Sequence, residues 1–167
     1  MKQITLMFFL LLLVIPNLGW TQEEFRGIKW GANITELSDM IPEQAPPKTG
    51  PDIKYYSRKG EENKIGEIAV TKIIYSFYKD KFWAAGINFD NYSSYQSLLA
   101  GLTSKYGNGY HPNRYIEEYN WFLSTLAIAI KYSNISKIGS VNYYYKPISN
   151  EMSEDRKKAG EKAKKEL

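Results

Sequence analysis

The clearest alternation of apolar and polar positions in this chain lies between residues 73 and 107. β-Branched and aromatic residues open the stretch and predict a strand, which a short polar turn ends. Strict alternation over 82–90 predicts a second strand, one side of which should face the core: Trp83, Ala85, Ile87 and Phe89. Apolar residues then recur every three or four positions over 93–106 and predict a helix, with Ser93 as its N-cap and Gly107 at its end. The roles of the apolar residues and of Gly107 in this hairpin and helix are explained by core packing and helix capping, so none of them is a candidate for chemistry.

The same two periodicities predict the other elements. A short helix over 33–41 should begin at Asn33, with Glu36 as the partner in a capping box and Pro42 as its end. Further strands are expected over 53–58, 65–78, 115–123, 126–132 and 140–146. We expect the second of these to be bulged near residues 71–72. A helix precedes each set of three strands, so one hypothesis is a duplication into two helix-plus-three-strand halves. The fold class is α+β, an antiparallel sheet with helices packed on one face.

The chain opens with the features of a signal peptide, which we assign to residues 1–21. Lys2 gives a positive start, and an apolar run of about ten residues follows over 6–15. This run is too short for a bilayer span, which needs about twenty residues. Small residues favour cleavage between Gly19 and Gln22, and an uncleaved N-terminal anchor is the alternative. A lipoprotein anchor is excluded because the chain has no cysteine to acylate.

The rest of the chain suits one domain over 22–148, followed by a charged tail over 149–167 that is either helical or disordered. No later apolar run is long enough for a membrane span, so we expect no transmembrane segment after signal removal. The absence of cysteine excludes disulfides, iron–sulfur centres and thiol chemistry. For an exported domain it favours a bacterial periplasm or the cell exterior. We therefore expect a periplasmic or secreted protein.

The charge pattern argues against nucleic acid as a partner. Lys and Arg number 22 and Asp and Glu number 18, which gives a formal net charge of only +4. The two signs interleave, so no basic stripe is available to follow a phosphate backbone. Aromatic residues, 15% of the chain, suit strands with one solvated face.

Residues for catalysis or metal binding are few. His111 is the single histidine, in a loop far from any nucleophile motif, so neither a triad nor a zinc site is expected. Among the acids, Asp80 is explained as a turn former and Asp90 as a residue that precedes a helix start. Glu117 and Glu118 are left as candidates for glycoside hydrolysis. We predict no catalytic residue, no metal and no cofactor, and a protein that is not an enzyme.

The aromatic surface is the remaining lead. Neighbouring rings in the tyrosine runs must point to opposite faces of a strand, so some rings should be exposed. We take Tyr55, Tyr143 and Tyr145 as candidate binding residues, together with Tyr110 and His111 of the loop after the second helix. The alternative is that these rings only cover a two-sided sheet.

Several short motifs resemble those of one type of protein. They are EFRGIKWG near the start of the predicted mature chain, the hairpin YSFYKDKFWAAGINFD, a helix ending in SKYG and a later strand with Trp121. Over residues 25–145 the chain is similar to small exported bacterial proteins of unknown function that share this arrangement. The resemblance implies export and an α+β fold, and it carries over no catalytic residue.

We therefore expect an exported, non-enzymatic binding or interaction module of the bacterial envelope, with an envelope protein or polymer as its partner. An inhibitor that presents the loop 107–114 to an extracellular enzyme is one form of this hypothesis. The alternatives are a small envelope-glycan hydrolase that uses Glu117 or Glu118, and a structural envelope component whose tail contacts an anionic surface.

Overall fold

The computed structural model describes residues 23–47 and 49–166. The predicted signal peptide and its cleavage site lie outside the described residues.

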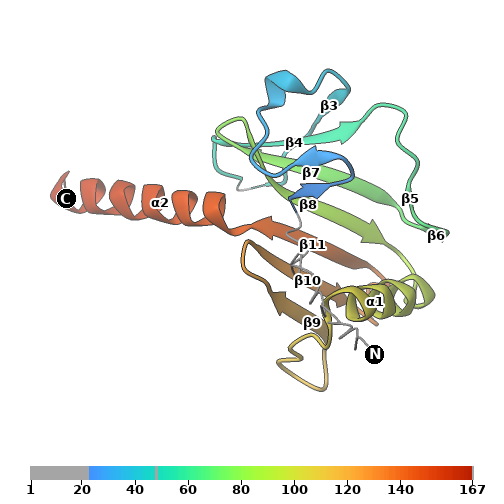
Figure 1. The fold of residues 1–167 in the computed structure, drawn as a ribbon. Coiled ribbons are helices and arrows are strands. Elements are labelled where there is room, and N and C mark those ends of the chain that lie inside the picture. The colour runs from blue at the N-terminus through green and yellow to red at the C-terminus, as the bar shows by residue number, and fades with distance from the viewer. Residues whose placement is uncertain (1–22, 48, 167) are drawn as a thin grey trace, which may run out of the picture.

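One antiparallel sheet forms the centre of the domain (Figure 1). Its seven strands, in order across the sheet, are β3 (Met40–Glu43), β4 (Ile53–Arg58), β7 (Lys72–Tyr78), β8 (Lys81–Phe89), β11 (Gly139–Tyr145), β10 (Leu126–Tyr132) and β9 (Glu117–Phe122). The smaller elements are the hairpin of β1 (Glu24–Phe25) with β2 (Ile28–Lys29), the hairpin of β5 (Lys64–Ile65) with β6 (Ile68–Ala69), and a 3₁₀ turn, η1 (Ile34–Glu36). The helices are α1 (Tyr92–Tyr106) and α2 (Lys146–Glu166). The predicted α+β class with an antiparallel sheet is confirmed.

Apart from the edge strand β3, the sheet consists of two three-stranded meanders, β4-β7-β8 and β9-β10-β11, joined through their third strands. β8 and β11 pair antiparallel, with Ile87 opposite Val141. An approximate two-fold repeat would produce this order. A full helix precedes only the second meander, because the first begins with η1 and the edge strand β3.

The predicted helix over 33–41 is wrong. Asn33 does cap a turn, since its Oδ1 accepts a hydrogen bond from the Thr35 backbone N–H at 3.0 Å, but the turn ends at Glu36. The chain then becomes strand β3, which includes Pro42. Proline is tolerated there because β3 is the edge strand and its outer side needs no N–H donor.

The single long strand predicted over 65–78 is also wrong. Gly66 takes a positive φ of 59° and closes the small β5–β6 hairpin, and β7 begins only at Lys72. The bulge lies elsewhere, in the β7–β8 hairpin. Its position determines which side chains reach each face of the sheet.

An extra residue in β8 produces this bulge at Trp83. Ser76 of β7 pairs with Ala84. The next residue of β7, Phe77, pairs with Phe82, so Trp83 has no partner of its own. Phe82 is therefore fully buried in the core, and Trp83 turns to the opposite face of the sheet. The prediction that Trp83 faces the core is wrong, whereas the other three residues of that predicted set do lie in the core.

The main core lies on the face of the sheet that α1 covers. Trp30, from the segment after β2, stacks on Phe82 with ring centroids 4.5 Å apart. Tyr95 of α1 is buried against the same core. α1 begins one residue earlier than predicted, because Asn91 is the N-cap and its Oδ1 accepts from the Ser94 N–H at 2.7 Å. Gly107 ends the helix at a positive φ of 79°, where a glycine is favoured.

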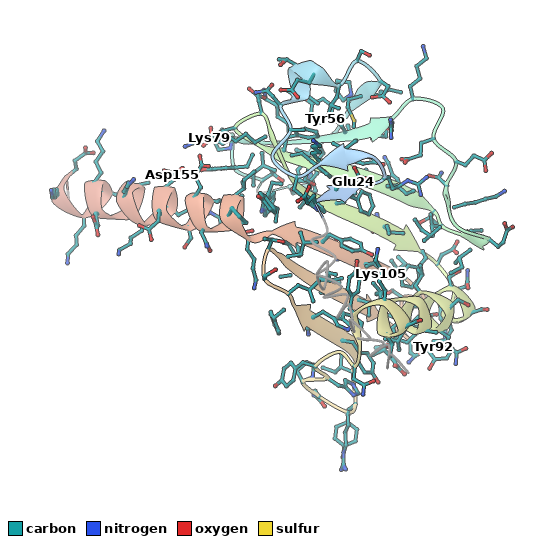
Figure 2. All side chains as sticks on the ribbon, in the orientation of Figure 1. Glu24, Tyr56, Lys79, Tyr92, Lys105 and Asp155 are labelled. Carbon is teal, nitrogen blue, oxygen red and sulfur yellow. The ribbon has the colours of Figure 1, made fainter. Side chains whose placement is uncertain are left out.

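The second helix, α2, continues directly from β11 and projects away from the sheet (Figure 1). Its buried residues are Ile148 and Met152, which form a small second cluster with Tyr78. Figure 2 shows Lys79 and Asp155 side by side where the helix leaves the sheet, and their Nζ and Oδ2 atoms are 2.6 Å apart. The predicted tail 149–167 is helical as far as the structure describes it.

Candidate binding groove

The face of the sheet opposite the main core carries small and polar side chains. Strand alternation places these residues on it: Ile74 and Ser76 of β7, Ala84, Gly86 and Asn88 of β8, and Ser140, Asn142 and Tyr144 of β11. The described helices leave its centre uncovered, because α1 packs on the core side and α2 contacts only one end. We call this the open face.

A groove of about 340 Å³ lies at the centre of the open face. Ser76, Ala84 and Gly86 form its floor, and the rings of Tyr55, Trp83 and Tyr144 form its sides. The segment after β3 completes a wall. The side chains of the floor are small, which leaves space above the sheet for the groove. The bulge in β8 turns the Trp83 ring to this face, where it forms part of the side of the groove.

The aromatic sides of the groove are held in place by α2. The Trp83 and Tyr144 ring centroids are 5.7 Å apart, with the planes tilted by 46°. Trp83 Nε1 donates a hydrogen bond to Ser149 Oγ at 2.8 Å, and Ser149 Oγ in turn donates to the Tyr145 carbonyl at 3.0 Å. Burial, and to a smaller extent the neighbouring Tyr55 phenol, raise the pKa of Tyr144. Its hydroxyl therefore remains a hydrogen-bond donor at neutral pH.

Charges at the groove are balanced. Glu43 and Lys72 are the charged residues of the lining, and they form an ion pair with Oε2 and Nζ 2.7 Å apart. The hydrogen bond from Lys72, assisted by Ser57, lowers the pKa of Glu43. The carboxylate is thus ionised and matched by one ammonium group, so the groove offers no net charge to a ligand.

Polar groups in the groove have capacity to bind a ligand. Ser76 is only 6% exposed, and its hydroxyl has no hydrogen-bond partner among the described residues. The side chain of Asn88 likewise lines the groove without such a partner in the described part of the chain. Asn142 Nδ2 donates to Ser140 Oγ at 3.0 Å, while Asn142 Oδ1 lies over Gly86. Unpaired polar groups that line a concave site mark a place where a ligand or water can bind.

A second hollow of about 450 Å³ continues from the groove along the open face. Asn88 lines both hollows. The second one is bounded by Ser140 and Lys131 and by the exposed side chains of Ile116 and Ile138. Because Asn88 lines both, we treat the two hollows as one track, a shape that suits an elongated ligand.

The candidate binding residues predicted from the sequence do not gather in one site. Tyr55 lines the groove, but Tyr143 is 9% exposed and points into the main core. Tyr145 is half-buried and stacks on Trp30, with centroids 6.1 Å apart. Tyr55, Tyr143 and Tyr145 therefore form no exposed strip. The ring of the tyrosine run that does reach the open face is Tyr144.

The two loop candidates lie at the far end of the sheet, beyond β9. Tyr110 is 62% exposed, and its backbone pairs with that of Asn120. The His111 ring stacks on Tyr119 at 4.3 Å between centroids, and its Nε2 lies 2.9 Å from the Ile116 carbonyl. These contacts give His111 a structural part in ordering the loop.

The two carboxylates considered for hydrolysis are adjacent in β9 and so point to opposite faces of the sheet. Glu117 accepts hydrogen bonds from the Tyr95 hydroxyl at 3.0 Å and the Tyr92 hydroxyl at 3.3 Å. Glu118 accepts one from Asn120 at 3.1 Å. Within residues 23–47 and 49–166, no three His, Asp or Glu side chains are grouped so that they could hold a metal ion.

The fold and the groove define a small α+β domain with an open, aromatic-sided sheet face. No family model, curated protein or solved structure matches the chain. Neither of the helices that the structure describes is long and apolar enough to cross a membrane.

Proposed function

We propose that the protein is an exported, non-enzymatic binding module of the bacterial envelope that holds its ligand on the open face. The observation that carries the proposal is the groove itself. It joins three aromatic rings with the Ser76 hydroxyl and the Asn88 amide, which have no partner among the described residues. A concave site with apolar walls and a few convergent polar groups is the usual form of a ligand site. Export is inferred from the signal-like segment.

The positions of the acids favour binding over catalysis. A glycosidase needs two carboxyl groups about 5 to 9.5 Å apart on either side of one bond. Glu117 and Glu118 project from opposite faces of β9. Among the described residues the groove is lined by a single carboxylate, that of Glu43, which is paired with Lys72, and the second hollow by a single one, that of Glu118. Neither place supplies an acid and a base for the same substrate.

The test compares the exported protein with a Tyr144→Ala variant in capture of solubilised envelope material. Tyr115→Ala is the matched control, because Tyr115 is 79% exposed and lies in neither hollow. We expect Tyr144→Ala to lose capture and Tyr115→Ala to retain it. Equal capture by all three proteins would place the binding surface elsewhere. Turnover of envelope glycan that depends on Glu117 or Glu118 would replace the proposal with the hydrolase alternative.

A further inference from the structure

We infer that the ligand of the groove is an uncharged glycan chain; this inference rests on the proposed function. The first argument is the shape of the walls. Sugar rings present flat C–H faces that pack against aromatic rings, and Tyr55, Trp83 and Tyr144 line the groove. The hydrogen bond from Trp83 to Ser149 fixes one of these rings before any ligand arrives, which reduces the entropy lost on binding.

The second argument is the polar chemistry of the floor. A sugar hydroxyl both donates and accepts, as do the Ser76 hydroxyl and the Asn88 amide. The Asn142 amide already donates to Ser140, and its Oδ1 lies over Gly86 in the groove. These groups suit sugar hydroxyls better than an ion, because a bound cation needs several acceptors and a bound anion needs several donors.

The third argument is charge. Glu43 and Lys72 neutralise each other at 2.7 Å, and no other charged residue among those described lines the groove. The second hollow adds one acid, Glu118, and one cation, Lys131, so it too has no surplus of either sign. An anionic polymer would meet Glu43 with no surplus cation, and a cationic one would meet Lys72 with no surplus acid. An uncharged ligand leaves the ion pair intact.

The fourth argument separates a glycan from an extended peptide. Peptides that add to a sheet use the free backbone groups of an edge strand. The groove lies over β7, β8 and β11, which are interior strands with neighbours on both sides. Their backbone groups are used in the ladder, so only side chains can recognise a ligand there. Because the track continues through Asn88 into the second hollow, the ligand is a chain that exceeds one sugar unit.

The experiment measures binding of the exported protein to an array of neutral oligosaccharides, followed by calorimetry with a hexasaccharide and a disaccharide of the best series. We expect the hexasaccharide to bind at least about tenfold more tightly than the disaccharide, since it reaches both hollows. Tyr144→Ala should weaken binding about tenfold or more, and Tyr144→Phe, which keeps the ring, should retain most of it. Ser76→Ala serves as a second variant if Tyr144→Ala does not fold. Absence of groove-dependent binding to any neutral glycan overturns the inference.

A second arm separates failure of this inference from failure of the proposed function. Envelope material is treated with periodate, which cleaves the vicinal diols of sugars, or with protease, before capture. We expect periodate to abolish Tyr144-dependent capture and protease to leave it. If protease abolishes it and periodate does not, the ligand is a protein, so the glycan inference fails while the binding function stands. If no capture depends on Tyr144, both fail.

Discussion

The substitution Gly139→Ala tests the register that decides which tyrosines face the groove. Gly139 begins β11 and is buried, paired with Phe89 of β8 and with Tyr132 of β10. A Cβ atom built on it would lie 2.1 Å from Phe89 Cε2 and 2.8 Å from the Lys131 carbonyl oxygen. Carbon atoms pack no closer than about 3.5 Å, so one of these neighbours must move by more than 1 Å, by this order-of-magnitude comparison.

Neither neighbour moves easily. The Phe89 ring is 1% exposed and stacks on Tyr132 with centroids 6.3 Å apart, and the carbonyl belongs to the backbone of β10. Overpacking of this kind costs about 1–3 kcal/mol, and the double conflict places the expected loss near the upper end, at about 3 kcal/mol. For a domain of this size that corresponds to a fall in Tm of about 10 °C.

The assay is urea and thermal unfolding of both proteins, followed by circular dichroism. Gly101→Ala is the matched control, because a Cβ there meets nothing within 4 Å and the residue lies inside α1. It should stabilise the protein by about 0.5–1 kcal/mol. If Gly139→Ala leaves stability unchanged within about 0.5 kcal/mol, the resolution of such a comparison, the β8–β11 register is wrong. A slip of one residue would turn Tyr144 into the core and remove the groove.

Three further predictions concern the helices. Asn91→Ala should destabilise the protein by about 1 kcal/mol in urea unfolding through loss of the α1 cap, whereas Ser93→Ala should have little effect. Hydrogen bonds from Lys79 and Tyr78 lower the pKa of Asp155 below its ordinary value of 3.8. The contribution of Asp155 to stability is therefore fully present above that ordinary value and is lost as the pH falls through the lowered pKa. Asp155→Asn should therefore lower the urea midpoint of unfolding at pH 7, and the midpoint of the variant should decrease less than that of the natural protein below about pH 4. The same decrease of the midpoint at low pH in both proteins would contradict this pairing. Met152→Ala removes a buried contact of α2, so trypsin should cleave the helix at residues 156–158 severalfold faster. The control Ser153→Ala, at an exposed position, should leave the cleavage rate unchanged. Equal rates for the two variants would show that Met152 does not anchor the helix.

The sequence pattern predicted most of the sheet because the strands obey local alternation, but the open face depends on contacts between distant segments. Phe82 turns inward because its backbone pairs with the segment after β2: its N–H donates to the Ala32 carbonyl at 2.8 Å, and it accepts from the Gly31 N–H at 2.9 Å. Nothing near Phe82 in the sequence indicates this partner. The resulting bulge sends Trp83 to the groove, where alternation alone placed it in the core.

The tyrosine run illustrates the same limit. Alternation requires neighbouring rings at 143–145 to face opposite ways, and this is what the structure has. Which ring faces the groove depends on the pairing of β11 with β8, and this pairing is fixed partly by the need for glycine at position 139. The sequence correctly predicted Asn33 as an N-cap. It did not predict that the following segment pairs with β4 as the edge strand β3, so a strand and not a longer helix follows the capped turn.

The measurement that tests the central claim, a ligand site on the open face, most directly is amide chemical-shift mapping of the isotope-labelled protein on addition of a neutral oligosaccharide or solubilised envelope material. The account predicts shifts concentrated at Ser76, Asn88, Asn142 and Tyr144, extending towards Ile138, with little change in α1. Shifts confined to the 107–114 loop or to the core face, with none on the open face, would contradict it.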